Sequence, residues 1–530
     1  MNLEASIILT SGIILGFILR LRYLKLPLDW DHGILLYQSY WYYKTKKFVV
    51  SWSEIEREPP HPFAIGDKFM IRSQKLAHTF IYLIMYKICG HRVWAYRLFD
   101  AFYYLAITAV IFYWALILFN PFTAAAAASL FYIYSTMPFF WVADDNPEKF
   151  QLLFACAAFL FITLFLKNAN IAYVIMAGVC FFICMLFKQN IGITIAAVLM
   201  YLGMSGGWNH AGIMTAVILM LYIILFASYK LRGLALSVIF GHFFINVYLL
   251  QYLFNFKREE SGKLAAAKIE TFKERLIPNL KNNFKEASLL WIGVIAWIIY
   301  CFKTHPSHSG FIFLMVILCS TLITFFISNK FYPYYYIPFL PLAAISTGNL
   351  FSMYIQNYGP ISAQSIILFT AALVLLMQNA VRTFGFFFKR KPKQQAYYMY
   401  SNTLCNFAAS EEIGKYIQQN SSEEDCIYVP ELNPEIYFLS KRRCPINLIY
   451  MDATLLQLLS KDEKKETFSI IFNKLKKYQP VYIVLLKGTS IQIGMFEKAI
   501  GKKYFIEHVF MAGFNYLGKS LFIQLFRRRD

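Results

Sequence analysis

Long apolar segments alternate with short polar interruptions along most of this 530-residue chain. A helix needs roughly 20 residues to cross the hydrocarbon core of a bilayer. Segments of about this length predict about eleven membrane spans, at residues 4–24, 97–118, 121–141, 149–167, 171–187, 190–205, 211–229, 288–302, 310–327, 336–354 and 361–381. The pattern therefore predicts a polytopic α-helical membrane protein.

The polar sequence gathers on one face of this predicted bundle, because each span reverses the side of the chain. The segments on that face are 25–96, 142–148, 188–190, 230–287, 328–335 and the tail after 382. The positive-inside rule does not orient the face, since the short loops carry one or two cations on either side. The apolar segment 235–256 is either a pair of surface helices or a further span, and a further span would invert the sides downstream.

Two aromatic-rich stretches in the first long loop, residues 33–43 and 75–84, are apolar but too short to span. Such segments are typical of helices that lie in the membrane interface. We expect them to wall a cavity at the membrane surface.

The composition changes after Val381, through a basic hinge at residues 389–393. Beyond the hinge, helical and strand patterns alternate: a helix is predicted at Glu411–Gln419, and strands at Cys426–Val429, Val481–Leu486 and Leu521–Leu525. These patterns predict two domains, a transmembrane domain at 1–385 and a small α/β domain at 386–530. An extracytoplasmic position would permit a disulfide between Cys426 and Cys444.

Composition agrees with a membrane protein, since 58% of the residues are hydrophobic, 15% are charged and the mean hydropathy is +0.47. The formal net charge is +21. Because the basic residues flank apolar spans, their expected partners are anionic lipid headgroups or phosphates, and nucleic acid is not an expected partner.

Asp29 and Asp31 directly follow the first span, on either side of Trp30. A carboxylate at a membrane interface can be partly desolvated, and then act as a general base or bind a cation. The simpler alternative is that Asp31 caps a helix that begins at Gly33. A short Asp-x-Asp pattern does not decide between the two.

A second acidic cluster, Asp144, Asp145 and Glu148, lies between two predicted spans. Three carboxylates at a membrane surface cost solvation unless they are hydrated, paired or bound to a cation. The alternative is a solvated turn in which Pro147 opens the next helix. We expect the turn to be structural and also to aim its acids at the same cavity as Asp31.

Cations interrupt the apolar sequence on the same face. Lys188 needs an anionic partner at its depth, either a phosphate or a carboxylate, unless its side chain snorkels to the headgroups. Lys330 with Tyr332 and Tyr335 could grip a phosphate, although tyrosines are also common in an aromatic belt. Acids and cations on one face suit a lipid-linked phosphate substrate, with the cations on the phosphate and an acid activating a hydroxyl acceptor.

Several of these stretches, in this order, resemble the landmarks of the C-type integral-membrane glycosyltransferases. The nearest branch is similar to the protein O-mannosyltransferase and aminoarabinose transferase group. The stretches are Leu28-Asp29-Trp30-Asp31-His32-Gly33 with Tyr37, Arg97-Leu98-Phe99-Asp100, Asn146-Pro147-Glu148, Phe187-Lys188-Gln189, and Tyr334-Tyr335-Tyr336-Ile337-Pro338 with Pro341. The likeness spans about residues 5–350 and continues weakly into the tail.

The resemblance implies transfer of a sugar, with inversion, from a polyprenyl-phosphate donor to a hydroxyl acceptor on a lipid, glycan or protein. It places the enzyme in the plasma (inner) membrane, with its active face and the α/β domain at 386–530 extracytoplasmic. Asp31 or Asp29 then resembles the catalytic acid of the first loop, and Asp144 or Asp145 the acid of the second outer loop. Asp31 is the preferred base, while Asp29 orients it or helps to hold a cation.

The donor phosphate would be bound by Lys188, Lys330 and Tyr335, with Glu148 and Tyr332 beside them. The sequence departs from relatives that carry a Lys-Pro-Pro element late in the first loop: here the region reads Arg57-Glu58-Pro59-Pro60-His61-Pro62, and Lys68 and Arg72 beyond it become further candidates. The metal requirement is open, and if a divalent cation is used, Asp29 and Asp31 are its predicted ligands.

A transporter or lipid flippase is the alternative function, because it too has many spans and buried polar residues. Transporters commonly show internal repeats and charges at the bilayer midplane. Here the charges lie at the ends of spans on one face, which favours an enzyme.

Overall fold

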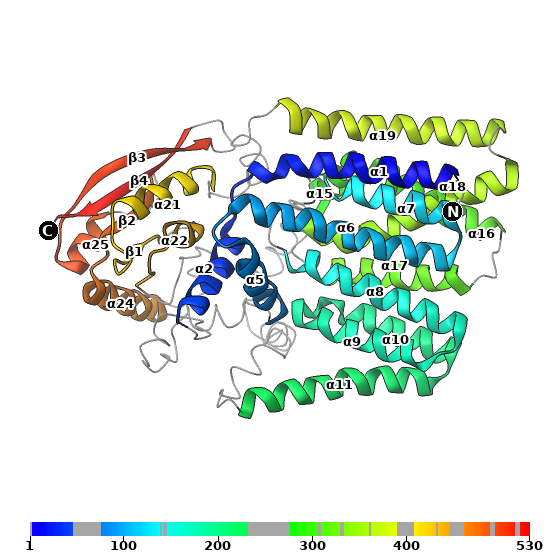
Figure 1. Cartoon of the computed structure of the whole chain (residues 1–530), viewed down its shortest axis with the longest axis horizontal. Helices are drawn as coiled ribbons and strands as arrows, with labels where there is room; N and C mark the ends of the chain where they lie inside the picture. Colours follow the sequence, from blue (N-terminus) through cyan, green and yellow to red (C-terminus); the bar gives the residue numbers. More distant parts are fainter. Residues whose placement is uncertain are drawn as a thin grey trace. The chain divides into compact units, whose positions relative to one another are not determined.

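The structure is a computed structural model, and it divides into two compact units that are described separately (Figure 1). Unit 1 comprises Met1–Tyr23, Lys75–His78 and Leu98–Lys389; unit 2 comprises Leu24–Gln74, Thr79–Arg97 and Arg390–Asp530. The residues that the structure describes are 3–45, 76–137, 140, 146–231, 276–304, 309–328, 333–359, 362–389, 407–430, 433–445, 461–487, 493–514 and 520–529. The predicted domain division at 385/386 stays a prediction.

Unit 1 is built of helices. In chain order they are α1 (Leu3–Leu21), α6 (Val93–Leu118), α7 (Pro121–Tyr134), α8 (Pro147–Asn168), α9 (Ile171–Phe187), η3 (Gln189–Ile191), α10 (Gly192–Gly206), α11 (Trp208–Leu231), α15 (Ile277–Glu286), α16 (Ser288–Thr304), α17 (Ser309–Ser328), η5 (Pro333–Phe339), α18 (Leu340–Tyr358) and α19 (Ala363–Lys389). The short 3-10 turn η1 (Arg22–Lys25) follows α1, and the first residues of α6 belong to unit 2.

Every predicted span overlaps a helix, in three cases together with a 3-10 turn, although α7 ends at Tyr134, before the predicted end at residue 141. Among the described residues, five helices are long and apolar enough to cross a membrane. The number is six if α15 and α16, which meet at a bend of 95°, count together as one span. Several others are apolar but shorter, including α7 and α9. The protein is therefore mostly helical with apolar helices, while the count of about eleven spans stays a prediction. The uncertain segment 235–256 lies outside the described residues.

The start of α18 differs from the prediction for a clear reason: the helix begins at Leu340 and not at residue 336. The tyrosine-rich stretch before it forms the 3-10 helix η5, which contains Pro338. Pro338 and Pro341 lack a backbone N–H, so they are tolerated at a helix start but not in its interior. The two prolines therefore delay the α-helix.

Small residues bring α1 and α18 close to α7. A Cβ atom added at Gly12 of α1 would lie 2.3 Å from Cβ of Ser129, and one at Gly348 of α18 would lie 3.0 Å from the carbonyl oxygen of Thr123. Close backbone approach through small residues is a common way to pack helices in membranes. The run Ala124–Ala128 of α7 is accordingly buried.

A buried arginine ties the end of α1 to the end of α7. Arg20 donates from Nη2 to the carbonyl oxygen and the hydroxyl of Ser135, at 2.7 and 2.6 Å. Its guanidinium also lies 3.7 Å from the ring centroid of Tyr104, so the buried charge is held by both hydrogen bonds and an aromatic face.

Unit 2 joins the two loop helices to the C-terminal sheet. Its elements are α2 (Trp30–Thr45), α5 (Leu76–Cys89), η6 (Phe407–Ala409), α21 (Ser410–Gln419), β1 (Ile427–Tyr428), α22 (Glu435–Ser440), α24 (Lys461–Tyr478), β2 (Tyr482–Leu486), α25 (Ile493–Ile500), β3 (Tyr504–Phe514) and β4 (Ser520–Arg528). The sheet order is β1-β2-β4-β3, with β1 parallel to β2 and the other pairs antiparallel. The two loop helices and the small C-terminal sheet were predicted.

The strand β3 was not predicted. Its alternation is broken where the register with β4 shifts, between Ile506 and His508 and again between Met511 and Gly513. These irregularities hide the period of two that marks a strand. Cys426 and Cys444 are both buried, and no disulfide joins them in this structure.

Candidate functional site

The predicted site residues fall into three groups. Asp29, Glu148, Lys188 and Tyr335 are described. Asp31 lies in the first turn of α2, where the structure describes its backbone. The others lie outside the described residues: Lys68, Arg72, Asp144, Asp145, Lys330 and Tyr332.

Glu148, Lys188 and Tyr335 meet in unit 1, although three separate elements supply them. Pro147 opens α8 after the extended residue Asn146, which places Glu148 in the first turn. Lys188 is the extended residue that ends α9. Its Nζ atom forms an ion pair with Oε1 of Glu148 and lies 4.3 Å from the ring centroid of Tyr335.

Burial and the ion pair together set the charge state of Lys188. The Glu148 side chain is fully buried, while 23% of the Lys188 side chain remains exposed. Burial acts to lower the pKa of Lys188, but the Glu148 carboxylate outweighs it, with help from Tyr335, and the pKa lies above its usual value. Lys188 therefore stays charged, and of the two partners that the sequence allowed, a phosphate or a carboxylate, it contacts a carboxylate.

Gln151 fixes the backbone that carries Lys188. Its Nε2 atom donates to the carbonyl oxygens of Cys184 and Lys188, at 2.9 and 2.6 Å. The other Glu148 oxygen, Oε2, is buried and has no hydrogen-bond partner among the described residues. The cluster is thus a preorganised charge pair at the start of α8 and the end of α9. One of its oxygen atoms, Oε2 of Glu148, can still accept a hydrogen bond.

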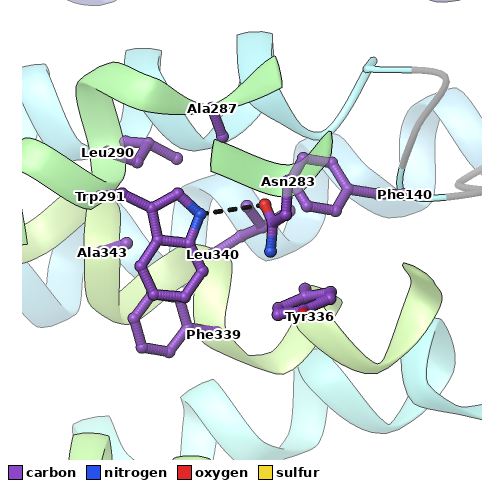
Figure 2. A pocket seen from close by; sticks show the side chains of 9 residues that line it. All are labelled: Phe140, Asn283, Ala287, Leu290, Trp291, Tyr336, Phe339, Leu340 and Ala343. Atoms are coloured by element: carbon purple, nitrogen blue, oxygen red, sulfur yellow. Dashed lines mark hydrogen bonds between the residues drawn. The ribbon is translucent and has the colours of Figure 1, made fainter. Parts of the chain in front are cut away.

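The helical segment η5, which carries Tyr334 and Tyr335, is itself locked in place. Trp291 of α16 faces η5 (Figure 2), and the packing between them leaves no space for a water molecule. The indole N–H of Trp291 donates to Oδ1 of Asn283 at 3.0 Å, and its ring stacks on Phe339 with centroids 4.5 Å apart. Packing at this point fixes where η5 presents its tyrosines to Lys188.

A second buried ion pair lies one residue further along α8. Lys149 donates from Nζ to Oδ1 of Asp100, at 2.9 Å, and both side chains are almost wholly buried. Asp100 belongs to the Arg97-Leu98-Phe99-Asp100 landmark, but neither Asp100 nor Lys149 was predicted to be a site residue. A charge inside an apolar run was the available signal, since such a charge must find a partner.

Asp29 in unit 2 caps the start of α2. Its Oδ1 atom accepts from the backbone N–H of His32 at 2.9 Å and lies 2.7 Å from Nδ1 of the same residue. The helix begins at Trp30, so the alternative of a helix that begins at Gly33 with Asp31 as its cap is wrong. Asp29 serves as the cap because its side chain reaches the free N–H groups of the first turn.

The charge of Asp29 is strongly stabilised. Burial acts to raise its pKa, but the charge and the two hydrogen bonds of His32, with the more distant charge of Arg97, outweigh it and hold the pKa at about 2. Arg97 also donates to the carbonyl oxygens of Leu26 and Pro27. The segment that leads into Asp31 is therefore fixed from both sides.

Glu435 of α22 lies against this segment and was missed by the sequence analysis. A Cβ atom added at Gly33 would lie 2.3 Å from the Glu435 backbone nitrogen, so only glycine permits the approach. Oε1 of Glu435 accepts from Ser410 and Asn433, while Oε2 is buried without a partner among the described residues. Burial, and the nearby charge of Asp29, raise the pKa of Glu435 to about 8.

Stability should therefore fall between about pH 5 and pH 8 and the Glu435→Gln variant should lose this dependence. The carboxyl group has a pKa of 4.5 when unfolded and about 8 when folded, so between these values the unfolded chain releases a proton that the folded chain keeps. The stabilisation is complete below the lower value and is lost as the pH rises through the higher one. Thermal unfolding in detergent at both pH values measures it, with the exposed Glu424→Gln as control. An unchanged pH dependence in Glu435→Gln would contradict the assignment.

In the described part of the chain, no group of three His, Cys, Asp or Glu side chains is placed to hold a metal ion. Oδ1 of Asp29, one of the two predicted ligands, is already engaged by His32.

Comparison with known proteins finds a family match over part of the chain. Residues 74–231 match the family model of the dolichyl-phosphate-mannose-protein mannosyltransferases. Comparison with curated proteins finds no match.

Two solved structures share the fold over nearly the whole chain. ArnT from Cupriavidus metallidurans, bound to undecaprenyl phosphate, superposes with a TM-score of 0.57 at 14% identity, covering 98% of this chain and 97% of that one. The Archaeoglobus fulgidus oligosaccharyltransferase, tethered to an acceptor peptide, gives 0.51 at 12% identity, covering 92% of this chain and 69% of that one. The chain therefore has the fold of the C-type integral-membrane glycosyltransferases, and the resemblance predicted from its sequence is confirmed.

Proposed function

We propose that this protein transfers a sugar, with inversion, from a polyprenyl-phosphate donor to a hydroxyl group on a lipid, glycan or protein. The observation that carries the proposal is the family match at residues 74–231, because this segment contains Asp100, Glu148, Lys149 and Lys188. The match and the shared fold together support the enzyme class, a glycosyltransferase that uses lipid-linked donors.

The proposed reaction needs a base and a stabilised leaving group. A carboxylate, for which Asp31 is the preferred residue, accepts the proton of the acceptor hydroxyl. The hydroxyl oxygen forms a bond to the anomeric carbon as the bond from that carbon to the phosphate oxygen breaks. Attack from the side opposite the phosphate inverts the configuration, and polyprenyl phosphate leaves with the electron pair.

The Lys188 cluster suits the leaving group. Lys188 keeps its charge through Glu148, yet part of its side chain is exposed, so a phosphate oxygen can share the ammonium group. The phenols at Tyr334 and Tyr335 lie beside it and can donate further hydrogen bonds. Such charge stabilisation acts where negative charge develops in the transition state. Lys330, Tyr332, Lys68 and Arg72 remain further candidates for the same phosphate.

Asp29 has a different proposed part. Its carboxylate is turned toward His32 at the start of α2, so we assign it to holding the Asp31 segment in place. The acids and cations of the candidate site fall on one predicted face, and we place the reaction at the extracytoplasmic face of the plasma (inner) membrane because the family resemblance implies that side. Asp144 and Asp145 would lie on that face, where either could be the acid of the second outer loop that the resemblance implies.

Transfer is tested with the full-length protein in nanodiscs, polyprenyl phosphate carrying a radiolabelled sugar, and an acceptor fraction made from membranes of the source cells. We expect label to move from the lipid donor to the acceptor fraction and free polyprenyl phosphate to accumulate. A flippase would instead move intact donor across the bilayer. Label that changes sides in sealed vesicles while staying on the donor would therefore favour the alternative function.

A further inference from the structure

A separate cavity of about 500 Å³ lies within unit 2. Lys25, Lys415 and Lys441 line it, with a single acidic residue, Glu411. Leu24 and Trp94 add an apolar portion to the wall. None of these residues takes part in the candidate site described above, so the cavity calls for its own explanation.

The cavity is electropositive. Among the described residues, no acidic side chain forms an ion pair with any of the three lysines. Lys441 is the left-handed residue that ends α22, with φ of 57°, and this fixed turn holds its backbone at the cavity wall. Burial, and next the charge of Lys441, lower the pKa of the lining residue His91 to about 4, as expected beside an uncompensated cation.

The cavity also lies where two candidate membrane spans end. Lys25 is the last residue of the span Leu3–Lys25, and Val93 is the first residue of the span Val93–Leu118. Trp94 is 50% exposed, and tryptophan at a span end is typical of the headgroup level of a bilayer. A cationic cavity with an apolar wall thus lies at the ends of two candidate spans, where lipid phosphates are expected.

We propose that this cavity binds the headgroup of an anionic bilayer lipid, with the three lysines around its phosphate and with Trp94 and Leu24 beside the glycerol and first acyl carbons. Lysine ammonium groups attract lipid phosphate as point charges, and apolar contact selects a lipid over a free ion. The site is independent of the proposed sugar transfer, and its ligand need be neither donor nor acceptor.

Trp94 supplies the probe. The full-length protein in an uncharged detergent is titrated with phosphatidylglycerol or phosphatidylcholine whose acyl chains carry bromine, and quenching of tryptophan fluorescence is followed. We expect phosphatidylglycerol to quench at about tenfold lower concentration than phosphatidylcholine. Trp94→Phe should remove this saturable part of the signal, which places the lipid in the cavity.

Charge variants test the lysines. The double variant Lys415→Gln, Lys441→Gln should need about tenfold or more phosphatidylglycerol to reach half-maximal quenching. Replacing the same two lysines with arginine should retain binding, and so should Lys476→Gln with Lys498→Gln, which removes equal charge from exposed positions outside the cavity. Equal quenching by both lipids, or full competition by inorganic phosphate at the same concentration, would overturn the proposal.

Discussion

Replacing Asp31 with Asn lowers the rate of sugar transfer by about 10²- to 10⁴-fold, the usual contribution of a general base. The amide keeps the shape of the side chain but cannot accept the acceptor's proton. Asp31 lies in the first turn of α2, where backbone and neighbours are fixed by Asp29 and Gly33. The expected variant is therefore folded, binds donor and is inactive.

The assay compares initial rates of label transfer for wild type and Asp31→Asn at matched amounts of protein. Glu424→Gln removes an exposed carboxylate from the same unit and should leave the rate unchanged. Binding of polyprenyl phosphate, measured separately, should survive in Asp31→Asn. A variant that transfers sugar at the wild-type rate would remove Asp31 from the mechanism and leave Asp144 or Asp145 as the remaining candidates.

Replacing Lys149 with Met lowers the free energy of unfolding by about 3–5 kcal/mol, the usual cost of leaving one partner of a buried pair alone. Lys149 is fully buried, and its partner Asp100 is 5% exposed, so water cannot take the place of the lost ammonium group. Methionine fills a similar volume, which limits the loss of packing against Phe150.

Unfolding in a titration of denaturing detergent measures this loss. Asp100→Leu combined with Lys149→Met should recover most of the stability, because no charge is then left buried without a partner. The double variant is the matched control, since it removes the same ammonium group without creating an orphan carboxylate. Single variants whose losses simply add in the double variant would show that the two side chains are not energetically coupled.

The helices of unit 1 could be predicted because apolar run length is a local property. The segment 171–187 coincides with α9 at both ends, since Asn170 caps its start and Lys188 ends it. The residue types at Lys188 and Glu148 also marked them, because each interrupts an apolar context. Their pairing could not be predicted, since nothing local tells which acid will meet which cation.

The place of Glu435 beside the Asp31 segment could not be predicted from local sequence at all. In the sequence it follows Pro434 and resembles any acidic residue in the first turn of a helix, a position that the helix dipole favours. Its contact with Gly33 exists only in the tertiary structure. Strand β3 escaped prediction for a different reason, because two register shifts against β4 break the alternation that a sequence pattern can detect.

The contact between the first loop and α22 has a consequence for the synthesis of the chain. The hydroxyl of Tyr37 accepts a hydrogen bond from the backbone N–H of Cys444, across 407 residues, and Gly33 packs on Glu435 in the same unit. At a usual translation rate, the ribosome needs about 20–80 s to cover such a separation. The loop that carries Asp31 thus reaches its final packing only when translation is nearly complete, so a chain released early would lack the finished packing around Asp31.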